Sequence, residues 1–345
     1  MKKKIVYIAN AQVIGCLLVV FGHSYPFNVY IPALLESIKN FVYCFHMPLF
    51  VFVSGFLVVK ADSIKKYGSL NFIKNRALKL LIPYAILSII GIAPKVLMKN
   101  YINDKVEITA NYLIRIFLVP RENIWGHFWF LPMIFVFAVL SVLIIKVLEK
   151  SYKTLYFLLV VGIILLFLPP MTSWFGINDI KNFIFYYILG MFIAKTEEFE
   201  KYIMPFKFIW ICLPAALIIQ IIESDNSFIH IAIGLVTALL MILLTIWISG
   251  KLHFKQIRVA ETLNQNIYPI FLLSWPCQVV VEVFANRILH INVLIVMILM
   301  FFAGVLGPLL IVKMICFVET HTPIRFLSII IGGNSNEKRT TCMEN

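Results

Sequence analysis

FVYCFHMPLFVFVSGFLVV, at residues 41–59, contains no charged side chain. The hydrocarbon core of a bilayer is about 30 Å thick, so a helix that crosses it needs about 20 mostly apolar residues. This stretch therefore predicts a transmembrane helix. Polar groups inside a membrane are costly to bury and are often functional, which makes His46 a candidate site residue. Pro48 follows two residues later and suits the first turn of a helix.

The rest of the chain has the same apolar character. Of its 345 residues, 61% are hydrophobic, only 14% are charged and 30 are phenylalanine. A soluble protein needs more polar surface than this composition supplies. We therefore predict an all-α polytopic membrane protein with about ten transmembrane helices. The predicted spans lie near residues 5–24, 41–59, 80–98, 127–148, 154–170, 183–194, 208–222, 228–248, 267–285 and 293–317.

The positive charges predict how these helices are oriented. Lys and Arg residues collect in the cytoplasmic loops of membrane proteins. With both termini in the cytoplasm, the predicted inner segments hold 22 of the 30 Lys and Arg residues. The outer segment at residues 95–126 is the one exception, and its acidic residues dilute its cations. Membrane topology thus accounts for the net charge of +13, and no nucleic-acid partner is expected.

The chain is predicted to form one membrane domain at residues 1–320 and a polar cytoplasmic tail at residues 321–345. The tail ends in GGNSNEKRTTCMEN, a composition typical of disorder. The basic and apolar N-terminus has no small-x-small cleavage site, so it is interpreted as a retained signal-anchor. The six cysteines form no CxxC pair, and no metal site is indicated. No sequence feature indicates an oligomeric state.

Three histidines stand at the predicted outer ends of separate spans. His23 ends the first span, His46 lies near the start of the second and His127 begins the fourth. Because these ends share one side of the membrane, the three imidazoles are expected to converge on one outward-lying cavity. Gly22, beside His23, would leave room there for a substrate. The alternative is that interfacial histidines simply reach toward lipid headgroups.

The first span carries a second polar group on the face of His23. Gln12 lies 11 residues before His23, which returns to within about 20° on a helix and rises about 16 Å. This face therefore predicts a polar stripe that lines a channel through much of the bilayer. The alternative is helix packing, because Gly15 and Cys16 are small residues on or beside the same face.

Several blocks of the sequence resemble acyltransferase family 3, the integral-membrane acyltransferases that include the fucose 4-O-acetylase relatives. FHMPLFVFVSGFLV at residues 45–58 has the most specific pattern, His-Met-Pro-Leu-Phe followed by Ser-Gly-Phe. Many members have an arginine or lysine where this chain has Gln12, and an aspartate where it has Ala9. The other similar blocks are LLVVFGHS at 17–24, NRALKLLIPY at 75–84, HFWFLP at 127–132, YYILGMF at 186–192 and NIYPIFLLSWP at 266–276.

The resemblance implies an O-acyltransferase of the plasma membrane. Members usually move an acetyl group from cytoplasmic acetyl-CoA, a co-substrate, to a hydroxyl of a cell-envelope carbohydrate or of its lipid-linked precursor. Ester formation needs a base for the hydroxyl proton, and an imidazole suits that role near neutral pH. The family match points to His23 as this base or as a transient acyl carrier. His46 would orient the acceptor, share the proton transfer or support the fold.

The donor side is expected to include Gln12, Arg76 and Lys79. Arg76 and Lys79 lie in a predicted cytoplasmic segment, where the CoA phosphates would be, and a guanidinium binds phosphate well. Cations on this side are also expected from topology alone. Whether Gln12 takes over the donor contact of the family's basic residue is left open.

The acceptor side is expected to include His127, Trp125, Trp129 and Ser274. The two tryptophans flank His127, and aromatic rings stack on the apolar faces of sugars. Their alternative role is to anchor the protein at the membrane interface. Ser274 stands where many family members have histidine.

A transporter or flippase for an envelope lipid or small solute is the alternative function. The sequence lacks the charged residues that proton-coupled carriers usually place within their spans. It also lacks paired broken helices in two similar halves. The glutamine at position 12 suggests a third class, a relative that binds or senses a ligand without catalysis.

Overall fold

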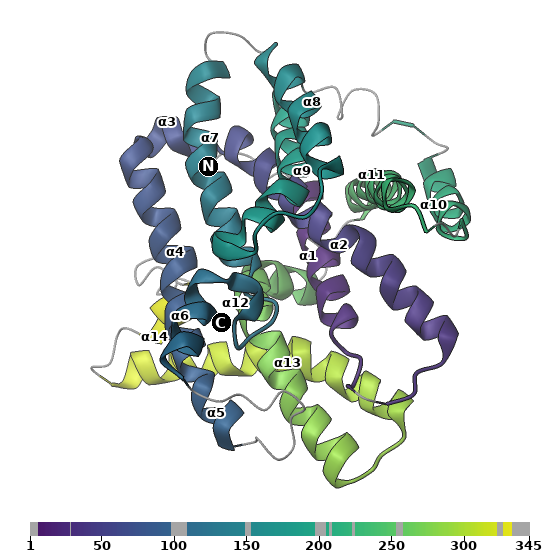
Figure 1. The fold of residues 1–345 in the computed structure, drawn as a ribbon. Helices are drawn as coiled ribbons and strands as arrows, with labels where there is room; N and C mark the ends of the chain where they lie inside the picture. The colour runs from purple at the N-terminus through teal and green to yellow at the C-terminus, as the bar shows by residue number, and fades with distance from the viewer. Residues whose placement is uncertain are drawn as a thin grey trace.

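The computed structural model describes residues 6–27, 29–97, 109–148, 153–196, 205–206, 209–222, 225–252, 258–322 and 327–332. These residues form a bundle of helices joined by loops, and they contain no β-strand (Figure 1). The all-α class that the sequence predicts is confirmed.

The helices are numbered in chain order. They are α1 (Val6–Gly22), α2 (Ala33–Lys60), α3 (Ser63–Tyr67), α4 (Ser69–Ile90), α5 (Ile92–Leu97), α6 (Ala110–Leu118), α7 (Phe130–Leu148), α8 (Thr154–Phe167), α9 (Ile177–Thr196), α10 (Cys212–Gln220), α11 (Ser227–Lys251), α12 (Arg258–Val281), α13 (Val293–His321) and α14 (Leu327–Ile330). The short 3₁₀ turns are η1 (Pro120–Glu122), η2 (Trp174–Gly176) and η4 (Ile209–Ile211), and a π-helical segment, η6 (Glu282–Ile288), extends α12.

Within the described parts of the chain, six stretches of helix are long and apolar enough to cross a membrane. They are α2, α4 with α5, α7, α11, α12 with η6, and α13. Three shorter apolar helices accompany them, namely α1, α8 and η4 with α10. The 20 residues of α9 include Asp179 and Lys181 near its start. The chain is thus a multi-pass membrane protein, while the count of ten spans and the orientation of both termini stay predictions.

The second helix is longer than its predicted span. α2 begins at Ala33, after Pro32, and ends at Lys60. Pro48 therefore lies inside the helix, and the expectation that it marks a helix start is wrong. A proline at this position has no N–H to donate to the carbonyl of Cys44, four residues earlier. His46 consequently lies in the body of the helix, between Cys44 and Pro48, the two residues that the missing hydrogen bond would join.

Two glycines allow α2 and α9 to approach closely. A Cβ atom on Gly55 of α2 would overlap the carbonyl oxygen of Tyr187. A Cβ atom on Gly190 of α9 would in turn overlap the carbonyl oxygen of Phe52. Small residues commonly bring membrane helices into backbone contact in this way. The pair α2 and α9 therefore forms a rigid unit within the bundle.

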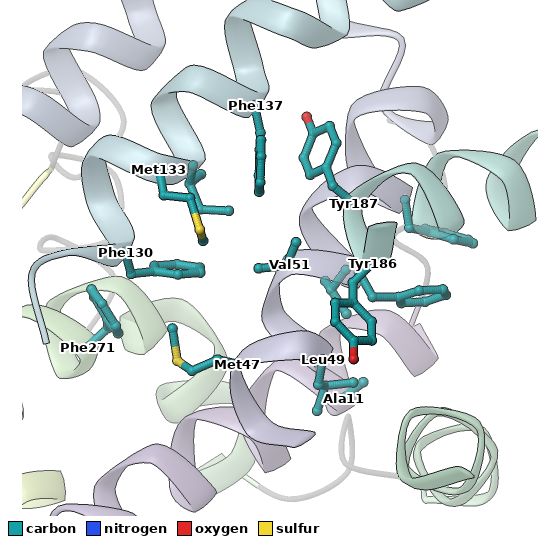
Figure 2. Packing of buried hydrophobic residues seen from close by; sticks show 14 of the residues in the cluster. Ala11, Met47, Leu49, Val51, Phe130, Met133, Phe137, Tyr186, Tyr187 and Phe271 are labelled. Atoms are coloured by element: carbon teal, nitrogen blue, oxygen red, sulfur yellow. The ribbon is translucent and has the colours of Figure 1, made fainter. Parts of the chain in front are cut away.

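The largest hydrophobic core lies between α2, α7 and α9. Leu49 and Val51 of α2, Phe137 of α7, and Tyr186 and Tyr187 of α9 are all buried in it. Figure 2 shows Phe137 and Tyr187 beside one another at one end of this cluster and Tyr186 near Leu49 at the other. This core fixes the positions of the helices that carry His46 and follow His127.

The first helix is held in the bundle by a buried asparagine. α1 packs against α2, α11, α12 and α13. The side-chain amide of Asn10 donates to the carbonyl oxygens of Ser249 and Leu252, each at 2.9 Å. Ser249 lies in the last turn of α11 and Leu252 directly follows it, where helix carbonyls have no partner in their own helix. This contact ties α1 to the end of α11.

The described part of the chain after α13 is folded. α14 packs against α4 and α13, Ile331 is buried, and Gly332 lies directly against the ring of Tyr268 on α12. Residues 327–332 thus form a short helix and turn packed on the bundle, with Ser328 and Ile331 buried, while the domain boundary at residue 320 and the disorder of the tail stay predictions. Residues 333–345 of the predicted tail lie outside the described residues.

Candidate functional site

His23 stands at the end of α1 among three aromatic neighbours. Its backbone N–H still donates to the carbonyl of Val19, at 3.1 Å, so the residue extends the last helical turn. The centroid of its ring lies 4.5 Å from that of Trp275 on α12 and 6.1 Å from that of His127. The rings of His127 and Trp275 are stacked at 5.9 Å. We call His23, Tyr43, His46, His127 and Trp275 the histidine cluster.

Tyr43 of α2 contacts both histidines that the sequence favours for catalysis. Its hydroxyl lies 3.1 Å from the carbonyl oxygen of Gly22 and 3.2 Å from Nδ1 of His23. Its ring lies 4.9 Å from that of His46. Tyr43 is 41% exposed, so the cluster opens here to the surface of the protein.

These two contacts of Tyr43 favour one tautomer of His23. A tyrosine hydroxyl has one hydrogen, and a carbonyl oxygen can only accept. If the hydroxyl donates to the Gly22 carbonyl, Nδ1–H of His23 donates to the tyrosine oxygen and both hydrogen bonds form. The other arrangement forms only one of them. The neutral imidazole then carries its free lone pair on Nε2, as a general base requires.

The end of α1 is shaped to receive Tyr43 and is held from α12. A Cβ atom on Gly22 would lie 2.9 Å from Cε2 of Tyr43, so the space expected there for a substrate is filled by this ring. The side-chain amide of Gln278 donates to the carbonyl of Val20, at 2.8 Å, and to Oγ of Ser24, at 2.9 Å. The turn that carries His23 is therefore fixed from both sides.

His46 is buried within α2, with 3% of its surface exposed. Its Nδ1–H donates to the carbonyl of Val42 one turn earlier, at 2.8 Å. This hydrogen bond leaves Nε2 as the lone-pair nitrogen of the neutral ring. His46 therefore belongs to the cluster through its contact with Tyr43. The imidazole packs against the Tyr43 ring from one turn later in α2.

His127 is a buried imidazole with unsatisfied nitrogens. It is 4% exposed, and neither ring nitrogen has a hydrogen-bond partner of normal geometry. Buried polar groups in proteins almost always have a partner, so this ring is suited to bind a ligand. The loop before it is anchored by Asn123, whose amide donates to Oγ of Ser88 at 2.7 Å and to the carbonyl of Ile116 at 3.0 Å.

The two tryptophans expected on the acceptor side lie outside the histidine cluster. The indole N–H of Trp125 donates to the carbonyl of Leu87 at 2.8 Å, which anchors the loop to α4. The guanidinium of Arg121 covers the ring of Trp129 at 3.7 Å and also binds Asp179. The ring of Trp129 is thus covered by a cation, and the indole N–H of Trp125 is engaged by α4. Ser274 is 1% exposed beside Trp275, the tryptophan that does join the histidines.

An ion pair closes the loop that precedes His127. Arg115 of α6 binds Glu122 of η1 through two of its nitrogens. The guanidinium holds the pKa of the Glu122 carboxyl below its usual range. Both side chains are partly exposed, so this pair contributes little to stability and mainly fixes the loop geometry.

A cavity of about 310 Å³ brings together the residues expected on the donor side. Gln12 of α1, with Arg76 and Lys79 of α4, lines one part of it, together with Asn264 and Gln265 of α12. None of the residues that line the cavity is acidic. The other lining residues are Phe50, Ser54, Leu57, Val58, Leu80, Phe130, Leu131, Ile134, Ala138, Tyr187, Ile267, Tyr268 and Phe271.

The polar part of the cavity is built by α4 and α12. The hydroxyl of Tyr268 donates to the carbonyl of Lys79, at 2.5 Å, and joins the two helices. The guanidinium of Arg76 lies 5.2 Å from the ring of Phe72, one turn earlier in α4. A cationic and amide-lined cavity of this kind is suited to an anion such as a phosphate. No group of metal-ligating side chains is found among the described residues.

The apolar end of the cavity touches the histidine cluster through Phe271. Phe271 lines the cavity, and its ring centroid lies 5.4 Å from that of His127. Phe130, which also lines the cavity, lies 5.4 Å from Phe271. A cationic cavity and a cluster of imidazoles thus lie on opposite sides of one layer of aromatic rings. This arrangement is suited to a transfer between a charged ligand and a second ligand at the histidines.

Comparison with known families defines the class of protein to which this arrangement belongs. A family model described as an acyltransferase domain, that of acyltransferase family 3, matches residues 5–313. The match covers most of the chain, so the protein belongs to this family and is a membrane acyltransferase. No curated protein and no solved structure matches the chain.

Sequence reasoning missed three residues that the structure adds to the site. Tyr43 lies three residues before His46, a helical spacing that places both on one face and was available as a signal. Trp275 follows Ser274 near the end of a predicted span, where a tryptophan is by default interpreted as an interfacial anchor. Phe271 was one of many apolar residues, and no sequence signal distinguishes it.

Proposed function

We propose that this protein transfers an acetyl group from acetyl-CoA to a hydroxyl of a cell-envelope carbohydrate or its lipid-linked precursor. The observation that carries the proposal is the position of the cavity beside the histidine cluster. The cavity offers cations and amides to a phosphorylated donor, and the cluster offers imidazoles to a hydroxyl. An acyl-CoA fits this arrangement, because its phosphates can bind the cations of the cavity while its thioester, far from the phosphates, reaches toward the imidazoles.

The donor binds in the cavity with its phosphates toward Arg76 and Lys79. Arg76 makes the directed contacts, because a planar guanidinium can bind two phosphate oxygens at once. Lys79 is exposed and adds charge at the entrance. Ligand-sized cavities span roughly 300–1,000 Å³, so this one of about 310 Å³ holds the thioester arm rather than a whole CoA. Gln12 contacts that arm by hydrogen bonding, without adding charge.

The acceptor enters at the exposed face of Tyr43 and meets His23. The hydroxyl attacks the thioester carbonyl while Nε2 of His23 takes its proton. The new C–O bond forms, the C–S bond breaks, and the imidazolium returns the proton to the leaving CoA thiolate. The unpaired nitrogens of His127 bind the acceptor or the thioester oxygen beside His23. His46 keeps the ring of Tyr43 in place.

The direct test is transfer by the purified protein in proteoliposomes. Under this proposal the donor is cytoplasmic and the acceptor belongs to the cell envelope. The assay therefore supplies labelled acetyl-CoA on one side of the vesicle membrane and extracted envelope polysaccharide on the other. We expect labelled ester on the glycan and one free CoA thiol for each ester formed. Absence of both products, with passage of a labelled envelope lipid or solute across the same vesicles, would overturn the proposal in favour of transport.

A further inference from the structure

The cavity and the histidine cluster are separated by a partition one aromatic ring thick. Phe271 contacts the cavity on one side and His127 on the other. Phe130 packs beside it, with the two ring centroids 5.4 Å apart, and also lines the cavity. Both are largely buried, at 7% and 9% exposure. The partition therefore has a cavity face and a histidine face.

The partition is built from two different helices. Phe130 is the first residue of α7, and Phe271 lies in α12 two residues after Pro269. Figure 2 shows the two rings close to one another, with Met47 of α2 beside them. Because Pro269 has no N–H, the carbonyl of Gln265 on the cavity wall lacks its helical partner, and α12 is less constrained there. The ring of Phe271 is thus carried by a locally weakened stretch of helix.

A group on the cavity side must cross this partition to reach the imidazoles. Rings in van der Waals contact leave no open passage, so the crossing group takes space from Phe271 or Phe130. The space available on the histidine side is limited by the packed rings of His127 and Trp275. A closed apolar partition also separates the thioester from water on the histidine side.

We propose that Phe130 and Phe271 form a gate for the acyl group, and that the bulk of Phe271 restricts transfer to acetyl. The inference rests on the proposed acetyl-CoA-dependent function and adds its specificity determinant. A donor bound through Arg76 presents its thioester at the gate, and the acyl group displaces the Phe271 ring as it passes. Each additional methylene needs further space that the stacked rings beyond the gate do not supply.

The test compares acetyl-CoA with butyryl-CoA as donors for the wild-type protein and for Phe271→Leu and Phe271→Ala. Discrimination by one methylene is about 10- to 200-fold in a fitted pocket. We expect the ratio of kcat/KM for butyryl-CoA to that for acetyl-CoA to rise at least about tenfold in both variants. The matched control is Phe185→Leu, an equally buried ring that packs against Tyr186 and Gly162 away from the cavity.

A larger ring at the gate gives the opposite readout. In Phe271→Trp, we expect kcat with acetyl-CoA to fall at least about tenfold while KM for acetyl-CoA stays unchanged, because the phosphate contacts are not touched. Phe130→Leu provides a second route to an enlarged gate if Phe271→Leu does not fold.

The outcomes distinguish the gate from the proposed function. Absence of acetyl transfer by the wild-type protein overturns the proposed function and the gate with it. Wild-type acetyl transfer together with an unchanged donor ratio in a folded gate variant overturns the gate alone. A ratio that rises equally in Phe185→Leu also overturns it, since the effect would then come from general loosening of the core.

Discussion

The histidine cluster and the cavity differ in how their polar groups are held. In the cluster, His23 and His46 each have a hydrogen-bond partner, and the turn at His23 is fixed by Gln278. In the cavity, Lys79 is exposed and Gln12 and Arg76 are half-buried. The polar groups of the histidine cluster are thus preorganised, whereas those of the cavity offer charge on adaptable side chains.

This difference matches what each end has to do. A general base must stand within hydrogen-bond distance of the hydroxyl, so its tautomer and position must be fixed before the substrate arrives. Phosphates attract cations over a longer range and tolerate several geometries. Substitutions in the cluster should therefore reduce kcat, and substitutions in the cavity should mainly raise KM.

The largest expected effect is at His23. In His23→Ala, acetyl transfer should fall by about 100-fold or more, because general base catalysis typically contributes 10²- to 10⁴-fold. Transfer to the glycan is measured with labelled acetyl-CoA, and the amount of protein in the membrane is measured in parallel. Unchanged transfer at a normal protein level would remove His23 from the mechanism. His290→Ala, a histidine far along the chain in the loop before α13, is the matched control.

The next effect is at Arg76 and tests the cavity end. A hydrogen bond to a charged group contributes about 1.5–3 kcal/mol, so Arg76→Ala should raise KM for acetyl-CoA by about 10- to 100-fold. kcat should change little. Arg76→Lys keeps the charge but loses the planar contacts, so its KM for acetyl-CoA should lie between that of the wild-type protein and that of Arg76→Ala. A fall in kcat with constant KM would contradict the division between the two ends.

Tyr43→Phe tests the preorganisation of the cluster. The ring remains and keeps its contacts with Gly22 and His46, while the hydroxyl that holds Nδ1 of His23 is lost. A neutral hydrogen bond contributes about 1 kcal/mol, so kcat should fall about fivefold with KM for acetyl-CoA unchanged. The pH profile of kcat is measured as well, because a tyrosine with a merely structural role would leave it in place. An unshifted profile at full activity would show that Tyr43 does not position His23.

The smallest effect is expected for Gln12→Arg, which sharpens the view of the cavity end. The cavity has no acidic lining residue, so an added cation attracts the donor phosphates without an internal partner. KM for acetyl-CoA should fall about threefold, with a steeper dependence on salt. Gln12→Glu is the matched control and should raise KM. A collapse of kcat in Gln12→Arg would instead place Gln12 at the reacting group.

Part of the site could be predicted from the sequence. The charge pattern and the family blocks pointed to Arg76, Lys79 and Gln12, and the structure places all three around one cavity. Three histidines at predicted span ends are found close together through Tyr43 and Trp275. The two tryptophans were predicted on the acceptor side because they flank His127, but in the structure the indole N–H of Trp125 binds α4 and Arg121 covers the ring of Trp129.

The sequence by itself determined that the chain is an all-α membrane protein of one acyltransferase family. Both properties depend on local composition and on short motifs in a fixed order along the chain, and the linear sequence contains both in full. The choice of His23 as the candidate base also came from such a motif, and it stays a prediction.

Only the tertiary structure decided which side chains meet. Helical spacing shows which residues share a face, but it does not show which face of a neighbouring helix lies opposite. The meeting of Tyr43 with His23, the occupation of the Trp129 face and the partition by Phe271 all depend on contacts between helices distant in sequence. Packing is a property of the whole bundle, so only the folded structure shows which candidate residues contact one another and which further residues join them.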